Sequence, residues 1–312
     1  MFGLNHCRRF IILTYHRVVS EPDSLRPSQI DSVSFARQME VLRRYFNVLS
    51  LSKAHSHLQD DSLPPRSVVI TFDDGYADNV HIALPILKRF GLPATFFVAT
   101  GYLNGGRMWN DTIIEAIRRT PLNHADLDFL GIDRLSLDDL DCRRKAIMEV
   151  IQSVKYLPVQ ERILNADKVA SILMAHSLPT DMMLTDDELR ALHSQGMEIG
   201  GHTVNHPILT QLSLDETRKE IMHGRDSLAE CLGVGIDSFA YPNGRPGKDY
   251  QASHVAVVRE LGFEVAVSTA WGPVRSSDDA WQLPRVGFTE FRKMHLFLQM
   301  LRSYSDPQAA RV

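Results

Sequence analysis

Short apolar runs and helical patterns alternate along most of the chain. The runs are only a few residues long and rich in β-branched and aromatic residues, as is typical of strands buried on both faces. They lie at Phe10–Tyr15, Ser67–Phe72, Ala94–Ala99, Met197–Gly201, Ser238–Tyr241, Glu264–Ser268 and Leu283–Val286. Because helical patterns fall between them, this order predicts an α/β fold with a parallel sheet, either open or closed into a barrel.

Capping signals mark several of the helices between these runs. Ser213–Glu216 and Thr185–Glu188 each have the pattern of a capping box, and Gly233 and Gly196 are placed to end the two helices that follow. The other predicted helices are one from Ser34 with Phe35, Met39, Leu42 and Phe46 on one face, one over about 77–90 that stops at Gly91, and one over about 290–301.

The stretch from Tyr102 to Met183 interrupts the alternation. It has the pattern of several helices, including an amphipathic one near Leu137–Val154, and no convincing strand. Strands resume directly after it, so we interpret it as a helical insertion, at about 102–190, within a single domain that spans residues 1–312.

Composition and charge narrow the function classes only slightly. The chain is 44% hydrophobic and 23% charged, like an ordinary globular protein, and its net charge of −4 comes without a dense basic run, which gives no support for nucleic-acid binding. Cys7, Cys142 and Cys231 are too few and too scattered for a disulfide framework. The apolar run Phe10–Leu13 is too short for a signal-peptide core or a transmembrane segment. We therefore expect cytoplasmic residence, either free or at the inner face of the membrane.

Two adjacent carboxylates, Asp73 and Asp74, follow the apolar run Val68–Phe72 and precede Gly75. Burying two carboxylates is unfavourable unless they are paired or bind a metal. Neighbouring side chains on an extended backbone point apart, so each carboxylate can serve a different partner. The alternative is a solvated turn, because Asp-Gly is a common turn dipeptide.

Two histidines, His202 and His206, follow the run Met197–Gly201. If this segment is a helical turn, histidines four residues apart lie on one face and can bind one metal ion. The alternative is a pair of ordinary surface or satisfied histidines. Both motifs stand at the ends of predicted parallel strands, where α/β folds gather functional residues. One carboxylate with two imidazoles suits a divalent metal, with Zn²⁺ preferred and Co²⁺, Ni²⁺ or Mn²⁺ also compatible.

These motifs resemble those of the polysaccharide deacetylases, the NodB-homology family or carbohydrate esterase family four. TFDDGY at Thr71–Tyr76 is similar to the first family motif, and HTVNH at His202–His206 is similar to the second. The resemblance covers most of the chain and implies a distorted (β/α) barrel of about seven parallel strands. It also implies that Asp74, His202 and His206 bind the metal and that Asp73 is the general base.

A third segment, Phe239–Gly244, is similar to the family motif whose backbone N–H stabilises the oxyanion. We therefore assign Tyr241, Pro242 and Asn243 to the oxyanion and substrate site. Many family members have an arginine in this motif that braces the base, but here Ala240 takes its place. Arg285 is our candidate to supply that charge from a neighbouring strand; the alternative is an ordinary surface arginine.

The general acid is assigned to His16, which follows the first strand in a Tyr-His pair similar to that of the exopolysaccharide branch of the family. A histidine suits this role because its pKa lies near neutrality. A buried structural histidine is the alternative reading, and His295, inside a predicted helix, is the alternative acid. Trp109, Trp271 and Trp281 are candidates to stack on a sugar ring or to line the acetyl pocket, although core packing is the preferred reading for each of them singly. Of the three, Trp271 has the best position for the site.

Three functions compete at this point. The first is removal of N-acetyl groups from a sugar of a surface polysaccharide or of its lipid-linked precursor. The second is hydrolysis of another C–N amide, such as a formamide or a cyclic amide, on the same fold. The third is carbohydrate binding without catalysis, which the intact set Asp73, Asp74, His202 and His206 argues against. An N-acetylated carbohydrate is thus the expected partner, and the oligomeric state is not predicted.

Overall fold

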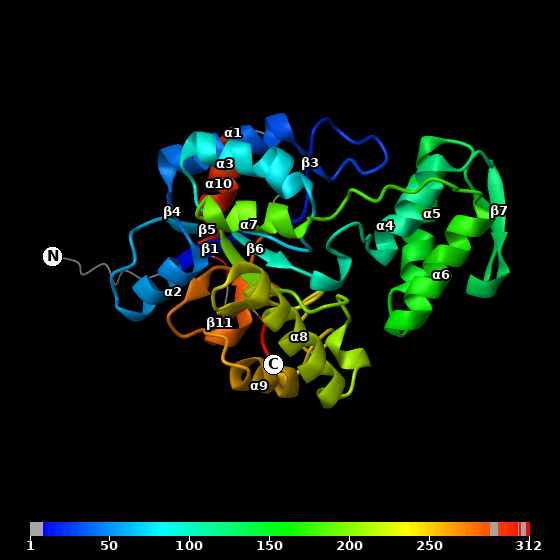
Figure 1. Cartoon of the computed structure of the whole chain (residues 1–312). Coiled ribbons are helices and arrows are strands. Elements are labelled where there is room, and N and C mark those ends of the chain that lie inside the picture. Colours follow the sequence, from blue (N-terminus) through cyan, green and yellow to red (C-terminus); the bar gives the residue numbers. More distant parts are fainter. Residues whose placement is uncertain (1–8, 288–292, 305, 307–309) are drawn as a thin grey trace.

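Seven parallel strands form a barrel at the centre of the computed structural model, which describes residues 9–287, 293–304, 306 and 310–312 (Figure 1). In spatial order they are β1 (Arg9–Tyr15), β5 (Ser67–Phe72), β6 (Thr95–Val98), β9 (Glu198–Gly201), β10 (Ser238–Ala240), β11 (Val265–Trp271) and β13 (Leu283–Arg285). The barrel closes where Val286 accepts a hydrogen bond from Thr14 N at 3.0 Å and donates to Ile12 O at 2.8 Å. Each predicted strand is present, and the distorted (β/α) barrel is confirmed.

Burial explains why these runs form strands. All six residues of β5 are buried, as are those of β6, because one face of each strand points into the barrel and the other is covered by helices. Shorter strands extend the sheet beyond the prediction: β4 (Asn47–Leu49) runs parallel to β5, and β12 (Val274–Arg275) runs antiparallel to β1. A separate short pair joins β2 (Val18–Val19) to β3 (Ile30–Asp31).

Helices surround the barrel, and their ends follow the predicted signals. Both capping boxes form, at Thr185 before α7 (Asp186–Ser194) and at Ser213 before α8 (Leu214–Leu232). Gly91 and Gly233 adopt the left-handed conformation that ends a helix, with φ of 63° and 70°. The remaining helices of the barrel layer are α1 (Ser32–Tyr45), α2 (Leu51–Gln59), α3 (Leu84–Phe90), α9 (Ala252–Glu260) and α10 (Lys293–Ser303).

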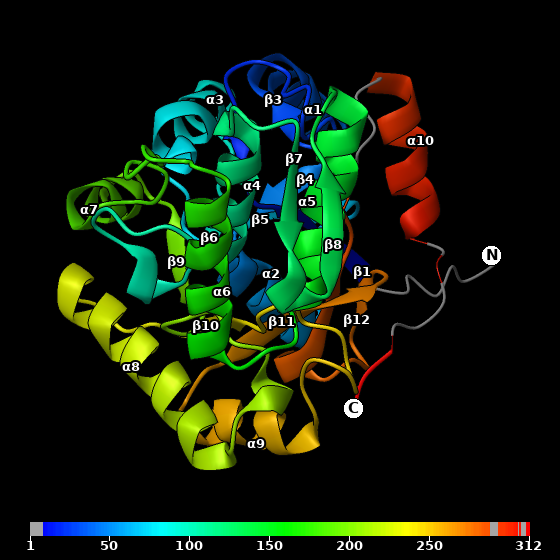
Figure 2. The ribbon, with the colours of Figure 1, turned by 90° about the vertical axis from the view of Figure 1, so that its right-hand side faces the viewer.

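The insertion stands to one side of the barrel, and Figure 2 views the molecule from that side. It contains α4 (Trp109–Arg119), α5 (Leu140–Val154) and α6 (Val159–Ile172), with a second hydrophobic cluster whose members, apart from Leu25, lie between Trp109 and Leu173. The expectation that this stretch has no strand was wrong, because β7 (His124–Leu127) and β8 (Ile132–Ser136) form an antiparallel hairpin. Buried and exposed residues are interleaved in both strands, so neither carries the continuous apolar run that marked the barrel strands.

Residues 288–292 lie outside the described residues, and so does the predicted start of the last helix at Glu290; the described helix α10 begins at Lys293. Cys7 also lies outside them, while Cys142 and Cys231 are free thiols. Within the described part of the chain, no helix is both long and apolar enough to cross a membrane.

Candidate active site

A cleft of about 560 Å³ opens at the carboxyl ends of the barrel strands. Residues from six barrel strands or from the loops directly after them line it, among them His16, Asp73, His202, Asn243 and Thr269. The loop between β2 and β3 and the insertion helices α4 and α5 add further lining residues. The sequence motifs therefore converge at the end of the barrel where this fold places its functional residues.

Asp73 continues the line of β5 and is 3% exposed. Its backbone N–H donates to Tyr15 O at 2.9 Å, which extends the pairing of β5 with β1 by one residue. Arg285, itself 2% exposed at the end of β13, donates from both terminal nitrogens to the two carboxylate oxygens of Asp73, at 2.7 and 2.8 Å. The Arg285 Nε donates to Ser268 O at 2.9 Å and fixes the guanidinium plane. Arg285 thus supplies to Asp73 the positive charge that the alanine at position 240 lacks.

Asp74 faces a different partner because the backbone turns sharply after Asp73. Its φ of 77° lies in the left-handed region, which an aspartate tolerates better than most residues, and the φ of Gly75 is 88°. A Cβ on Gly75 would approach Val98 Cγ1 to 2.9 Å, so the turn requires glycine there. The two carboxylates are consequently directed to separate tasks.

His202 and His206 lie in an irregular loop after β9 and not on the helical turn considered from their spacing. Two left-handed residues, Thr203 with φ of 66° and His206 with φ of 49°, curl the loop instead. Thr203 Oγ1 accepts a hydrogen bond from His206 N at 3.1 Å and holds the curl. The two imidazoles still converge, with ring centroids 4.8 Å apart.

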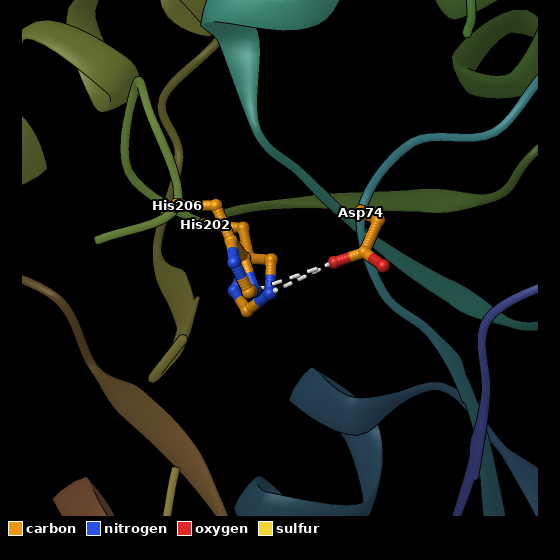
Figure 3. A group of neighbouring side chains, drawn as sticks. All are labelled: Asp74, His202 and His206. Atoms are coloured by element: carbon orange, nitrogen blue, oxygen red, sulfur yellow. Dashed lines mark ion pairs between the residues drawn. The ribbon is translucent and has the colours of Figure 1, made fainter. Parts of the chain in front are cut away.

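Asp74, His202 and His206 form a cluster whose ligand atoms all lie within 4.8 Å of one another. The Nε2 atoms of His202 and His206 are 3.4 and 3.5 Å from the same oxygen, Asp74 Oδ1, as Figure 3 shows. That oxygen is buried and accepts no hydrogen bond. His202 Nδ1 lies 2.7 Å from Ala240 O, so the tautomer that donates there leaves Nε2 free to act as a ligand. An orphaned carboxylate oxygen facing two such nitrogens fits a divalent metal.

The pKa values of the two histidines of the cluster shift in opposite directions. Burial acts to lower the pKa of His202, but the hydrogen bond and charge of Asp74 and the charge of Asp73 outweigh it and raise that pKa. Burial acts to raise the pKa of Asp74, but the two histidines outweigh it and hold that pKa well below its usual range. Burial lowers the pKa of His206 to about 3, which keeps this imidazole neutral. For Asp73, burial again acts to raise the pKa, and the charge and hydrogen bonds of Arg285 reverse the shift, so the carboxyl is ionised at neutral pH.

The histidine loop is held from behind by α8, which the sequence did not reveal. Glu220 accepts hydrogen bonds from Val204 N at 3.1 Å, Asn205 N at 2.9 Å and Asn205 Nδ2 at 2.7 Å. One turn further along α8, a Cβ at Gly224 would lie 2.8 Å from the backbone carbon of Thr203. Any side chain there would clash with the loop, so the close approach of α8 requires glycine. The one sequence signal is that Glu220 and Gly224 are four residues apart and so share a helix face.

The two candidate acids differ in their placement. His16 follows β1, lines the cleft and has a side chain that is 56% exposed, with Nε2 4.0 Å from Asp73 Oδ2. Its backbone carbonyl accepts a hydrogen bond from Asn79 Nδ2 at 3.0 Å, which fixes the turn that carries it. His295 belongs to α10, a helix of the outer layer that contacts α1, and its side chain lies outside the described ones.

The loop at Tyr241–Asn243 offers fewer donors than the sequence suggested. Tyr241 N donates to Val267 O at 3.2 Å within the sheet, and the Tyr241 hydroxyl donates away from the cleft to Trp281 O at 2.9 Å. Pro242 has no N–H. Asn243 lines the cleft with φ of 59°, and no hydrogen bond among the described residues uses its backbone amide. Asn243 is therefore the residue of this loop with an amide to offer an oxyanion.

The placement expected for Trp271 differs from the one observed. Trp271 is 52% exposed, is absent from the cleft lining, and donates from Nε1 to Asp306 Oδ2 at 3.0 Å. The indole that lines the cleft is Trp109, at the first turn of α4 in the insertion. Sequence position alone favoured Trp271 because it stands at a strand end, whereas Trp109 reaches the cleft only through the packing of the insertion.

Comparison with known proteins agrees with these observations. The family model described as "Polysaccharide deacetylase" matches residues 60–126 and 149–266, and the gap between these stretches falls in the insertion. The protein named "Putative polysaccharide deacetylase YxkH" of Bacillus subtilis (strain 168) is 38% identical over 277 residues, which cover 88% of this chain and 70% of the relative.

Solved structures share the fold at lower sequence identity. The deacetylase PplD of Streptococcus pyogenes, in complex with acetate, superposes with a TM-score of 0.64 at 21% identity, covering 94% of this chain and 98% of its own. IcaB from Ammonifex degensii superposes with a TM-score of 0.62 at 19% identity, covering 95% of this chain and 97% of its own. From the family model and the identity to YxkH, we conclude that the chain belongs to the polysaccharide deacetylase family.

Proposed function

We propose that this protein is a metal-dependent hydrolase that removes N-acetyl groups from a sugar of a polysaccharide. The observation that carries the proposal is the pairing of two differently held carboxylates at one strand end. Asp73 is clamped by Arg285 at 2.7 and 2.8 Å, while Asp74 presents an unpartnered oxygen to His202 and His206. A carbohydrate-binding protein needs neither an ionised base nor a set of metal-binding side chains beside it.

Asp74, His202 and His206 are the residues that would hold the metal, most simply Zn²⁺, with Co²⁺, Ni²⁺ or Mn²⁺ compatible with the same donors. When bound, the metal supplies a Lewis acid that polarises the acetamide carbonyl and lowers the pKa of water. Such help is needed because an amide is a poor electrophile at neutral pH.

The protein's own residues then divide the proton transfers. Asp73, ionised and oriented by Arg285, takes a proton from the attacking water. The Asn243 amide donates a hydrogen bond to the developing oxyanion. His16, on the exposed side of Asp73, gives a proton to the sugar nitrogen as the C–N bond breaks. Water and amide are thereby converted into acetate and a free amine.

The substrate is proposed to be an N-acetylated sugar unit of a surface polysaccharide or of its lipid-linked precursor. The cleft supports a sugar substrate because it is open, about 560 Å³ in volume, and lined by both polar and apolar residues, as a sugar ring with polar edges and apolar faces requires. Cytoplasmic residence, free or at the inner face of the membrane, belongs to the same proposal.

Metal analysis paired with acetate release tests this function. The purified protein is incubated with a panel of N-acetylated oligosaccharides and lipid-linked sugars, and acetate is measured enzymatically. The Asp73→Asn variant should keep its metal and lose acetate release, and the matched control Asp126→Asn, at an exposed position of the β7–β8 hairpin, should behave like the wild type. If Asp73→Asn keeps both its metal and its full rate, the base assignment is wrong. If formamides or cyclic amides are hydrolysed and acetylated sugars are not, the substrate class is wrong.

A further inference from the structure

One wall of the cleft, here called the outer wall, is built from a loop of the barrel and from the insertion. Its residues are Arg26 from the loop before β3, Trp109, Asn110 and Ile114 from α4, and Ile151 and Lys155 from α5 and its C-cap. The metal ligands and the general base come from other elements, so the outer wall does not take part in the proposed chemistry. Its position opposite the strand ends makes it a surface for the part of the substrate that does not react.

The loop and the insertion are fastened together, so the outer wall is one preformed surface. Arg118 of α4 donates to both carboxylate oxygens of Asp23, at 3.1 and 2.6 Å, and the Arg144 Nε of α5 donates to Ser24 O at 3.0 Å. Leu25, only 6% exposed, is part of the hydrophobic cluster of the insertion. In Figure 1 this loop, in dark blue before β3, extends toward the insertion.

The outer wall carries positive charge that is only weakly neutralised. Arg17, elsewhere in the cleft, forms a close hydrogen-bonded pair with Asp78 at 2.7 Å. Arg26 has no such bond: its nearest carboxylate oxygen, Asp111 Oδ1, is 3.8 Å away, and its side chain is 30% exposed. Lys155 lines the cleft and forms no salt bridge among the described residues. Two cations therefore remain available to a ligand.

A third cation lies behind the same wall. Arg162 of α6 is 2% exposed, and its guanidinium carbon lies 5.5 Å from the centroid of the Trp109 ring. Its Nε is buried without a hydrogen-bond partner, and among the described residues it forms no salt bridge. An arginine stays charged even when buried, so this guanidinium adds a positive potential to the outer wall. The carboxylates that line the cleft, Asp73 and Asp74, are already engaged by Arg285 and by the ligand cluster.

We propose that the outer wall is a subsite for an anionic group on the sugar chain, a carboxylate or a phosphate, with Arg26 and Lys155 as its binding residues. The proposal rests on the deacetylase function above and specifies its substrate class. A guanidinium matches the planar or tetrahedral oxygens of either anion, an ammonium serves as a point charge, and the half-buried Ile151 provides apolar area for the sugar ring that carries the anion.

Three oligosaccharides of equal length test the proposal. One is a neutral oligomer of N-acetylglucosamine, the second alternates N-acetylglucosamine with glucuronic acid, and the third is the neutral oligomer with a terminal phosphate monoester. The measured quantity is the ratio of kcat/KM on each anionic substrate to kcat/KM on the neutral one. We expect a ratio of roughly ten at low salt, the size of one charge-assisted hydrogen bond. The ratio should fall toward one at high salt, because exposed charges are screened.

Variants then assign the preference to the wall. Lys155→Gln and Arg26→Gln should each lower the ratio several-fold, mainly through KM, and Lys155→Glu should lower it further. The matched control is Lys53→Gln, an exposed lysine of α2 beside the amino ends of β6 and β9, which should leave the ratio unchanged. Thermal unfolding of each variant verifies that it is folded. Loss of Arg26 can lower stability because it leaves buried Asp111 without its nearby cation. Lys155 is the partly exposed C-cap of α5, so its variants test the proposal independently of that effect.

The outcomes separate this inference from the function on which it rests. Acetate release from all three substrates with a ratio of one in the wild type overturns the anionic subsite and leaves the deacetylase intact. A ratio that survives both Lys155→Gln and Arg26→Gln also overturns it, because the preference then arises elsewhere. No acetate from any acetylated sugar, with metal bound, refutes the proposed function itself. Preference for only one of the two anionic substrates identifies the anion as carboxylate or phosphate.

Discussion

Removing the charge of Arg285 should destabilise the fold as well as the site, because Asp73 would be left buried and unpaired. The guanidinium forms two hydrogen bonds to Asp73, one to Ser268 O and a longer one to Thr71 Oγ1 at 3.3 Å, and both charged side chains are almost fully buried. Breaking one side of a buried ion pair typically costs about 3–5 kcal/mol. We expect Arg285→Met to lose stability in this range.

A double-mutant cycle separates this effect from simple loss of packing. In the pair Asp73→Asn and Arg285→Met, neither charge remains, so the double variant should be more stable than Arg285→Met alone by about 2 kcal/mol or more. Urea unfolding of metal-free protein is the assay, since bound metal would add its own binding free energy to the folded state. The midpoint shift at constant slope then reports the change in stability.

The control is an arginine pair at the surface. Arg190 contacts Asp187 at 2.7 Å, but the two side chains are 51% and 95% exposed, so Arg190→Met should cost no more than about 0.5 kcal/mol. The reasoning is refuted if Arg285→Met costs no more than this control, or if adding Asp73→Asn fails to recover stability. Either result would mean that the Asp73 carboxylate is solvated or protonated in the folded protein.

The remaining predictions concern the acid, the metal and the pH dependence of stability. His16→Ala should lower acetate release from N-acetyl sugars by roughly 10²-fold or more while sparing 4-nitrophenyl acetate, whose leaving group needs no proton; the same pattern in His295→Ala would reverse the assignment. Chelation should lower the melting temperature of the wild type, and added Zn²⁺ should restore it; Asp74→Ala should show neither response, and a full response in Asp74→Ala would exclude this residue as a ligand. Burial raises the pKa of Asp111 to about 6 from 3.8, so its ionisation opposes folding, and the wild type loses stability as the pH rises through this window. Relative to Asp111→Asn, the wild type should lose about 1 kcal/mol between pH 5 and pH 8, measured by urea unfolding at both pH values; parallel profiles would show that Asp111 titrates normally.

Local patterns were sufficient to predict the elements of the barrel and much of the site. Each predicted apolar run became a barrel strand because burial on both faces requires a continuous apolar stretch, a property visible in a few consecutive residues. Asp73–Asp74 and His202–His206 were found for a related reason: each motif follows its strand directly, and parallel strands present their carboxyl ends at one edge. The hairpin of the insertion was missed because its strands mix buried with exposed residues.

Contacts between residues far apart in the sequence could not be predicted in this way. The bidentate contact between Arg285 and Asp73 joins residues 212 positions apart, and the sequence offered only the absence of an arginine at Ala240 as a hint. Nothing in the sequence indicated that Trp109 rather than Trp271 lines the cleft, since this depends on how the insertion rests against the barrel. That the amide of Tyr241 is used within the sheet, where it donates to Val267 O of β11, is likewise determined only by the register of the sheet.

By itself, then, the sequence determined the barrel and singled out the residues proposed as metal ligands and base, because these depend on short-range periodicity and on residues that adjoin strand ends. Only the tertiary structure decided that the histidines converge through two left-handed residues, that α8 holds their loop, and that Arg26 of the loop before β3 and Lys155 of the insertion line one side of the cleft. The physical reason is the separation in sequence over which each effect acts. Backbone preferences and burial act over a few residues, whereas side chains distant in sequence meet only after the whole barrel has packed.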